Sequence, residues 1–236
     1  MTLRKGGLPL SCPEQISNER PDANLGLEDL RIGKNQKSPR PSPEKERPVI
    51  SRRLLTRIGG LLEGNSEERI KSRSLLLTLP DYPRILVVCH GNLCRSPAAE
   101  GFLKRQLSSR RFEVSSGGLS HQENLPTPSD FVREGQAFGL DLSTHRSRTV
   151  SPLLAEWADL ILVMDRSNRD LLLDFGEGAL RKCAWLGAWD SGPLEIPDPF
   201  GTTSAVMSQI LVRLSRASEA LAKELSARFP AQPDSA

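Results

Sequence analysis

The sequence predicts an α/β fold for residues 84–229, with a four-stranded parallel sheet and helices on both faces. Short apolar runs alternate with longer segments in which apolar residues recur at helical spacing. Strands and helices that alternate in this way form parallel sheets covered on both sides. The first run, Ile85–Val88, is apolar throughout, as expected of a strand buried on both faces.

The other elements are expected in the following order. Further strands are predicted near 112–115, at 160–164 and at 183–186. Helices are predicted at 97–107, at 128–138 before Gly139, at 152–157, and after Asp165, which suits a helix N-cap. The last helix has the clearest pattern, because one face carries Val206, Ile210, Leu214, Ala217, Leu221 and Leu225.

A basic, proline-rich extension, residues 1–80, precedes this domain, and residues 230–236 form a C-terminal tail. The extension holds 15 of the 32 Lys and Arg residues and 10 of the 29 Asp and Glu residues. The remaining residues, 81–236, therefore hold 17 basic and 19 acidic side chains. We expect the extension to be largely disordered, with an amphipathic helix near 50–62. Its basic run from Arg31 to Arg57 predicts a solvated tail; contact with an acidic surface is the alternative.

Composition excludes several classes of protein. No apolar run approaches the ~20 residues of a membrane span, and the first residues lack the apolar core of a signal peptide. A cytoplasmic location without an integral membrane segment is therefore expected. Four cysteines are too few for a disulfide scaffold, and no histidine pair complements Cys89 and Cys94, so we expect no metal site and no cofactor.

The segment after the first strand has the features of a phosphate-binding loop. It runs from Cys89 through His90, Gly91, Asn92, Leu93 and Cys94 to Arg95 and Ser96. Backbone N–H groups in a tight loop, with a helix N-terminus behind them, bind anions. Ser96 suits an N-cap and Pro97 a first helical position, and Gly91 and Asn92 tolerate left-handed backbone angles.

Two side chains give this loop a chemical role. Cysteine attacks as the thiolate, and a helix N-terminus and an arginine both stabilise that anion at Cys89. Arg95 offers a planar fork that grips two phosphoryl oxygens at once. A cysteine followed six residues later by an arginine also arises by chance, and a buried cysteine after a strand is usually inert. The ordered strand, Gly-Asn pair and Ser-Pro pair favour the functional interpretation.

This stretch resembles the active-site loop of the low-molecular-weight protein tyrosine phosphatases, V-C-x-G-N-x-C-R-S-P-x-A-E. Four later segments are similar to blocks of the same family and follow its order. They are residues 114–118, 141–148, 159–165 and 196–201, the last reading Ile-Pro-Asp-Pro-Phe-Gly. The resemblance covers residues 84–229 and none of the first eighty.

The resemblance implies hydrolysis of phosphotyrosine through a phosphocysteine intermediate, with no metal. Cys89 would be the nucleophile, Arg95 the phosphate clamp and Asp198 the general acid and base. Pro197 and Pro199 would stiffen the loop that carries Asp198. Pro-Asp-Pro taken alone is more often a simple turn; the loop at Cys89 favours the catalytic interpretation.

The resemblance also implies supporting roles. Ser96 would donate a hydrogen bond to the Cys89 thiolate, and Asn92 would contact Ser96, Ser116 and His145. Cys94 would form a protective disulfide with Cys89. Three residues are expected at the substrate rim, namely His121, Leu125 and Phe200. Leu93 is the bulky aliphatic residue of tyrosine-directed members, whereas the arginine-phosphate phosphatases of the family place a threonine there.

Two other functions stay open. Arsenate reductases share this fold, but the thioredoxin-coupled ones need two further cysteines on a mobile segment. This chain offers only Cys183, beside a predicted strand. An inactive phospho-binding module is the other alternative, against which the intact Cys89, Arg95 and Asp198 argue. The expected partner is a tyrosine-phosphorylated protein, including autophosphorylating tyrosine kinases, on which bacterial members of the family often act.

Overall fold

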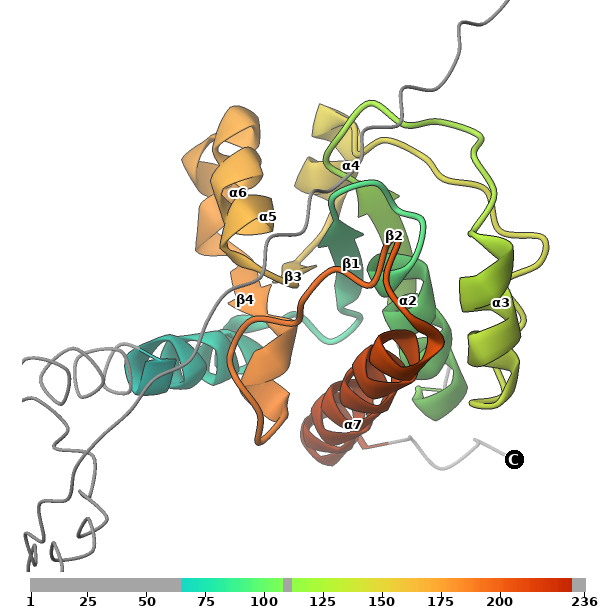
Figure 1. Cartoon of the computed structure of the whole chain (residues 1–236). Helices are drawn as coiled ribbons and strands as arrows, with labels where there is room; N and C mark the ends of the chain where they lie inside the picture. The colour runs from blue at the N-terminus through green and yellow to red at the C-terminus, as the bar shows by residue number, and fades with distance from the viewer. Residues whose placement is uncertain (1–64, 108–111, 231–236) are drawn as a thin grey trace, which may run out of the picture. The chain divides into compact units, whose positions relative to one another are not determined.

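Four parallel strands in the order β2-β1-β3-β4 form the centre of the molecule (Figure 1). The computed structural model describes residues 65–107 and 112–230, which all lie in one compact unit. The strands are β1 (Arg84–Cys89), β2 (Glu113–Gly118), β3 (Leu160–Val163) and β4 (Cys183–Trp185). The predicted α/β class and the four-stranded parallel sheet are confirmed.

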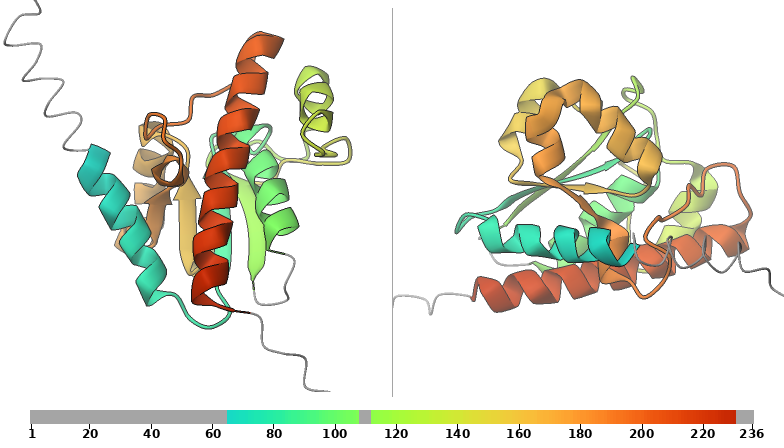
Figure 2. Two further views of the ribbon diagram at one scale, coloured as in Figure 1. Left: turned by 90° about the horizontal axis from the view of Figure 1, so that it is seen from below. Right: turned by 90° about the vertical axis from the view of Figure 1, so that its left-hand side faces the viewer.

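Helices cover both faces of this sheet (Figure 2). On one face, α2 (Arg95–Gln106) packs against the long α7 (Ser204–Arg228), and α3 (Ser129–Gln136) also contacts α7. On the other face lie α4 (Pro152–Trp157), α5 (Arg166–Leu171) and α6 (Gly176–Arg181). The described residues also form the 3₁₀ turns η1 (Leu75–Thr78), η2 (Leu172–Phe175) and η3 (Leu186–Trp189).

Burial explains why the sequence pattern locates these elements. All four residues of β3 and the last five of β1 are buried, as a central strand with helices on both sides requires. Of the predicted apolar face of α7, five residues are buried, whereas Val206 in the first turn is 37% exposed. Asp165 caps α5 as expected, because its carboxylate accepts a hydrogen bond from the Asn168 N–H at 2.8 Å.

Part of the predicted extension, which was expected to be largely disordered, belongs to the described residues. Residues 65–74, assigned to the disordered extension, form a helix that packs on β4 and η3. This helix is attached by polar side chains instead of an apolar stripe, so hydrophobic periodicity does not reveal it. The predicted helix at 50–62, the basic run from Arg31 and the tail after Pro230 lie outside the described residues.

No helix in residues 65–107 and 112–230 is both long and apolar enough to cross a membrane.

The starts of the two central strands are joined by an ion pair. Arg84, at the beginning of β1, donates from its backbone N–H and from its guanidinium to the carboxylate of Asp159, just before β3, at 2.9–3.0 Å. The hydrogen bond from the Arg84 side chain lowers the pKa of Asp159 below its ordinary value of 3.8.

We expect this pair to make the stability of the domain depend on pH. A carboxyl whose folded-state pKa is lowered stabilises the fold above its unfolded-state pKa, and that contribution is lost as the pH falls through the folded value. The Tm of Asp159→Asn should therefore lie below that of the wild type near neutral pH, with the difference shrinking below roughly pH 4. Thermal unfolding followed by circular dichroism measures this, and a Tm difference that stays constant on acidification would contradict it.

Candidate active site

The loop after β1 lies at the carboxyl ends of the parallel strands, the edge at which such sheets bind ligands. β1 ends at Cys89, and α2 begins at Arg95. The helix thus starts two residues before the predicted position, Pro97, with Cys94 at the N-cap position. Ser96 is not the cap, because its hydroxyl lies 3.1 Å from the Cys89 sulfur instead.

Asn92 is the hub of the hydrogen bonds that shape the loop. Its backbone is in the left-handed region with φ of 54°, which asparagine tolerates better than most residues. Its side-chain Nδ2 donates to the hydroxyls of Ser96 and Ser116, both at 2.9 Å. The backbone carbonyl oxygen of Asn92 accepts a hydrogen bond from His145 Nε2 at 2.8 Å. The structure thus brings together the four residues expected to hold the loop.

The direction of the hydrogen bonds around Asn92 follows from one backbone group. The N–H of Arg148 donates to Asn92 Oδ1 at 3.1 Å, which identifies the other end of the amide as the donor. Ser96 therefore accepts from Asn92, and its own hydrogen is left to donate to the Cys89 sulfur. Ser116 likewise accepts from Asn92 and donates to Glu100 on α2, a contact that the sequence did not suggest.

Arg95 is buried at the centre of the site and touches two carboxylates. Its Nη1 donates to Asp165, after β3, and to the Ile196 carbonyl at 3.1 Å. Its Nη2 donates to Asp198 at 2.8 Å. Burial by itself lowers the pKa of Arg95, but the negative charges of Cys89, Asp198 and Asp165 outweigh it, so the net shift is upward. Asp165 was predicted only as a helix cap.

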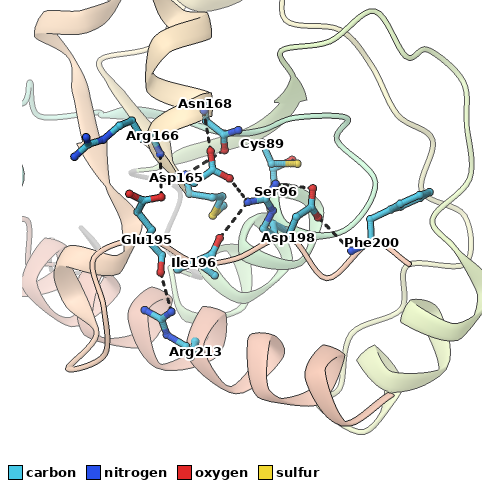
Figure 3. A network of polar contacts seen from close by, with 12 residues as sticks. Cys89, Ser96, Asp165, Arg166, Asn168, Glu195, Ile196, Asp198, Phe200 and Arg213 are labelled. Atoms are coloured by element: carbon cyan, nitrogen blue, oxygen red, sulfur yellow. Dashed lines mark hydrogen bonds and ion pairs between the residues drawn. The ribbon is translucent and has the colours of Figure 1, made fainter. Parts of the chain in front are cut away.

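Asp198 reaches Arg95 from the segment between η3 and α7, and its side chain is 46% exposed. Figure 3 shows Asp198 beside Ser96 and Cys89, with Ile196 and Asp165 on the other side of the network. Its second carboxylate oxygen accepts from the backbone N–H of Phe200 at 3.3 Å. The side chain therefore lies between a buried cation and the exposed Phe200 ring, within reach of solvent.

A cavity of about 110 Å³ opens above the loop. Its lining combines the loop with Asp198 and with one residue of the segment after β2. The lining residues are Cys89, His90, Gly91, Leu93, Cys94, Gln122, Asp198 and Phe200. Seven of these eight were singled out from the sequence, and Gln122 was not.

The rim after β2 differs from the expectation, because Gln122 lines the cavity and its neighbours His121 and Leu125 do not. The Gln122 side chain folds over Gly91, where a Cβ would lie 2.6 Å from Gln122 Oε1. Leu125 is instead tied to Ser147, whose N–H donates to the Leu125 carbonyl at 2.8 Å. These local contacts between loops carry no sequence periodicity, so the register of the rim could not be read from the sequence.

The two other described cysteines stay protonated near neutral pH. Burial, and then the charge of Cys89, raises the pKa of Cys94 far above its usual value. Burial raises the pKa of Cys183, in β4, to about 12. Cys94 lines the same cavity as Cys89, and both are free thiols in the structure, so the disulfide between them stays a prediction.

A family model described as low molecular weight phosphotyrosine protein phosphatase matches residues 84–231. The match spans well over half of the chain and contains every described residue of the cavity. The chain belongs to this family.

Curated relatives agree with this assignment. The low molecular weight protein-tyrosine-phosphatase Wzb of Salmonella typhi is 34% identical over 146 residues, which cover 62% of this chain and 96% of that protein. Its counterpart Etp of Escherichia coli K12 is 31% identical and covers 60% of this chain and 94% of that protein. The chain is therefore a phosphatase of this family, and the matches leave more than a third of its length uncovered.

Solved structures give the same picture. The tyrosine phosphatase Wzb from Escherichia coli K30, in complex with sulphate, superposes with a TM-score of 0.57 at 31% identity, covering 61% of this chain and 99% of that one. The YwlE arginine phosphatase from Geobacillus stearothermophilus superposes with a TM-score of 0.57 at 27% identity, covering 62% and 94%.

Gly118, at the end of β2, lies directly against the backbone of the loop after β1. A Cβ at this position would lie 2.9 Å from the carbonyl carbon of Gly91 and 3.1 Å from the Asn92 nitrogen. We expect Gly118→Ala to displace the loop and to lower kcat/KM for p-nitrophenyl phosphate about 10-fold or more, since small misplacements at a reacting centre are costly. Gly178→Ala, with nothing within 4 Å of the new methyl, is the matched control. Unchanged kcat/KM in a folded Gly118→Ala protein would show that the loop does not depend on this contact.

Proposed function

We propose that this phosphatase hydrolyses phosphotyrosine in proteins, with Cys89 as nucleophile, Arg95 as phosphate clamp and Asp198 as general acid and base. The observation that supports this most is the ion pair between Arg95 and Asp198, which lie 103 residues apart in the chain. It holds the carboxyl at the cavity that Cys89 lines. A candidate nucleophile and a candidate acid thus line one small cavity, and a buried cation is paired with the acid.

The loop and α2 supply what an incoming phosphoryl group needs. The N-terminus of α2 and the loop N–H groups favour an anion at this position. Among the described residues, the buried Arg95 Nε has no hydrogen-bond partner, so this donor is available to a phosphoryl oxygen. An unpaired buried donor costs free energy, and a bound phosphoryl group would remove that cost. We infer that the phosphoryl group also competes for Arg95 Nη2 and releases Asp198.

The first chemical step transfers the phosphoryl group to sulfur. The thiolate of Cys89, accepting a hydrogen bond from Ser96, attacks phosphorus in line as the bond from phosphorus to the tyrosine oxygen breaks. The protonated Asp198 gives its proton to that oxygen, because phenolate is a poor leaving group. Arg95 and the backbone N–H groups stabilise the charge on the equatorial oxygens.

The second step regenerates the enzyme. Asp198, now a carboxylate, accepts a proton from a water molecule, and the oxygen of that water attacks phosphorus. The sulfur–phosphorus bond breaks, Cys89 leaves as a thiolate, and inorganic phosphate departs. Ser96 stabilises the departing thiolate, as it stabilised the attacking one.

The rim of the cavity favours an aromatic substrate. Leu93 and the largely exposed Phe200 present apolar surface on which a phenyl ring can pack. Relatives that are named tyrosine phosphatases and a structural neighbour that is named an arginine phosphatase are similar to this chain, so the fold alone does not decide between the two substrates. Comparing kcat/KM for a phosphotyrosine peptide and a phosphoarginine peptide tests the proposal; preference for phosphoarginine would overturn it.

Removing the nucleophile and the acid should have different effects. We expect Cys89→Ser to abolish turnover of p-nitrophenyl phosphate. Asp198→Ala should lower kcat/KM for phenyl phosphate by about 10²–10⁴-fold, the usual contribution of a general acid. Its effect on 2,4-dinitrophenyl phosphate should be much smaller, because that leaving group departs without a proton. Equal losses on both esters would remove Asp198 from the role of acid.

The arsenate reductase alternative would require further cysteines as electron relays. Cys183 is buried in β4, and its raised pKa disfavours the thiolate that a relay needs. We expect Cys183→Ser to keep wild-type phosphatase kcat/KM within about 2-fold, because Cys183 lies in β4 and does not line the cavity. Loss of turnover in a folded Cys183→Ser protein would revive the relay hypothesis.

An autophosphorylating tyrosine kinase is the partner class that the family resemblance suggests. Incubating Cys89→Ser protein with lysate of the native host, and identifying the captured phosphotyrosine proteins, would name the substrate.

If the wild-type protein binds phosphotyrosine peptides without hydrolysing them, it is a binding module instead. The cytoplasmic location and the contact of the basic extension with an acidic surface stay predictions.

A further inference from the structure

The helix over residues 65–74 lies before the residues that match the family, 84–231, yet it is tied to the domain. It runs along the edge of the sheet beside β4 and η3 (Figure 2). The backbone N–H of Trp185, in β4, donates to Ser72 Oγ at 3.1 Å, and the Trp185 indole N–H donates to Glu68 at 3.1 Å. These contacts come from a segment that the family model does not contain.

Arg69 makes the densest contact of this helix with the domain. Its Nη1 donates to the carbonyls of Gly187 and Asp190, both at 2.7 Å, and its Nη2 donates to the carbonyl of Gly192. A guanidinium fork is well suited to joining several carbonyls, because its donors point in fixed directions. Arg69 thereby fixes the conformation of the turn at 187–192, because it binds three of the backbone carbonyls of that turn.

The same turn is held on its other side by α7. Arg213 donates to the buried carboxylate of Asp190 at 2.8 Å and to the Glu195 carbonyl at 2.9 Å. The next residue, Ile196, donates to the Met164 carbonyl at 2.8 Å and accepts from Arg95 at 3.1 Å. Figure 3 shows this succession from Arg213 through Glu195 and Ile196 to Asp198.

Few degrees of freedom separate the turn from the acid. Asp198 follows Gly192 by six residues, and Pro193, Pro197 and Pro199 each fix one backbone angle in or next to that span. A shift of the carbonyls that Arg69 holds is therefore passed along a short and restrained segment. The position of a general acid is critical, since proton transfer needs hydrogen-bond reach of the leaving oxygen.

We propose that Arg69 is a positioning residue for Asp198, acting through the turn at 187–192. This inference rests on the proposed function of Asp198 as the general acid. The helix over residues 65–74 is then a working part of the phosphatase, although it lies outside the matched domain. Arg69 touches no substrate, and its effect should appear only where the leaving group needs a proton.

The test compares Arg69→Ala with the wild type in the full-length protein. We expect kcat/KM for phenyl phosphate to fall about 10-fold, as misplaced catalytic groups cause, and kcat/KM for 2,4-dinitrophenyl phosphate to change less than about 2-fold. In an Asp198→Ala background, Arg69→Ala should cause no further loss on phenyl phosphate, since residues acting as one unit are not additive.

Arg73→Ala is the matched control. Arg73 is an arginine of the same helix, and it pairs with Glu224 on α7 at 3.2 Å. Its contact with the turn is one long hydrogen bond, from Nε to the Ala188 carbonyl at 3.4 Å, against the three that Arg69 makes. Its removal tests general loosening of the helix, and we expect both esters to be hydrolysed as by the wild type. If Arg69→Ala does not fold, Arg69→Lys, which keeps the charge without the fork, should show the same selective loss to a smaller degree.

Three results would overturn the inference. They are equal losses of Arg69→Ala on both esters, an undiminished loss in the Asp198→Ala background, and wild-type kinetics of a folded Arg69→Ala protein. Failure of the proposed function is distinguishable, because in that case Asp198→Ala itself would lack the leaving-group-dependent loss.

Discussion

The buried guanidinium of Arg95 is the constraint on which the site depends. A buried cation is costly unless it is paired and hydrogen-bonded, and the chain meets this demand from two segments distant in sequence. Asp165 comes from the end of β3, and Ile196 and Asp198 come from the segment before α7. Satisfying one arginine thus draws the end of β3 and the segment before α7 to the N-terminus of α2, and the cavity forms beside them.

Around this cation, each hydrogen bond of the loop has a defined donor and a defined acceptor. The amide of Asn92 has one acceptor, which is taken by the backbone of Arg148, and two donors, which are taken by two serines. Every donor of that amide is thereby assigned, and the hydrogen of Ser96 is directed at sulfur. Half-satisfied networks are costly in a medium of low dielectric constant, so a single buried asparagine specifies both the shape of the loop and the environment of Cys89.

Much of the fold and the site could be predicted because both have strong local signals. Apolar runs mark β1 and β3, helical spacing marks α7, and the residues from Cys89 to Ser96 carry the loop. The signal fails where tertiary contacts decide. Gln122 instead of His121 lines the cavity because Gly91 leaves room for its side chain, and Asp165 pairs with Arg95 because β3 lies beside β1. The helix over residues 65–74 docks by polar side chains, which sequence periodicity does not distinguish from a solvated segment.

That helix also has a consequence for how the molecule meets other copies of itself. β4 is an outer strand of the sheet, and an outer strand offers unpaired backbone groups on which another chain can add a strand. Ser72 occupies one such group of β4, and Glu68 takes the indole hydrogen of the same tryptophan. A protein shortened to residues 84–231 would lack Glu68 and Ser72, and the backbone N–H of Trp185 in β4 would lose its partner. Its self-association would then be a property of the shortening and not of the natural chain.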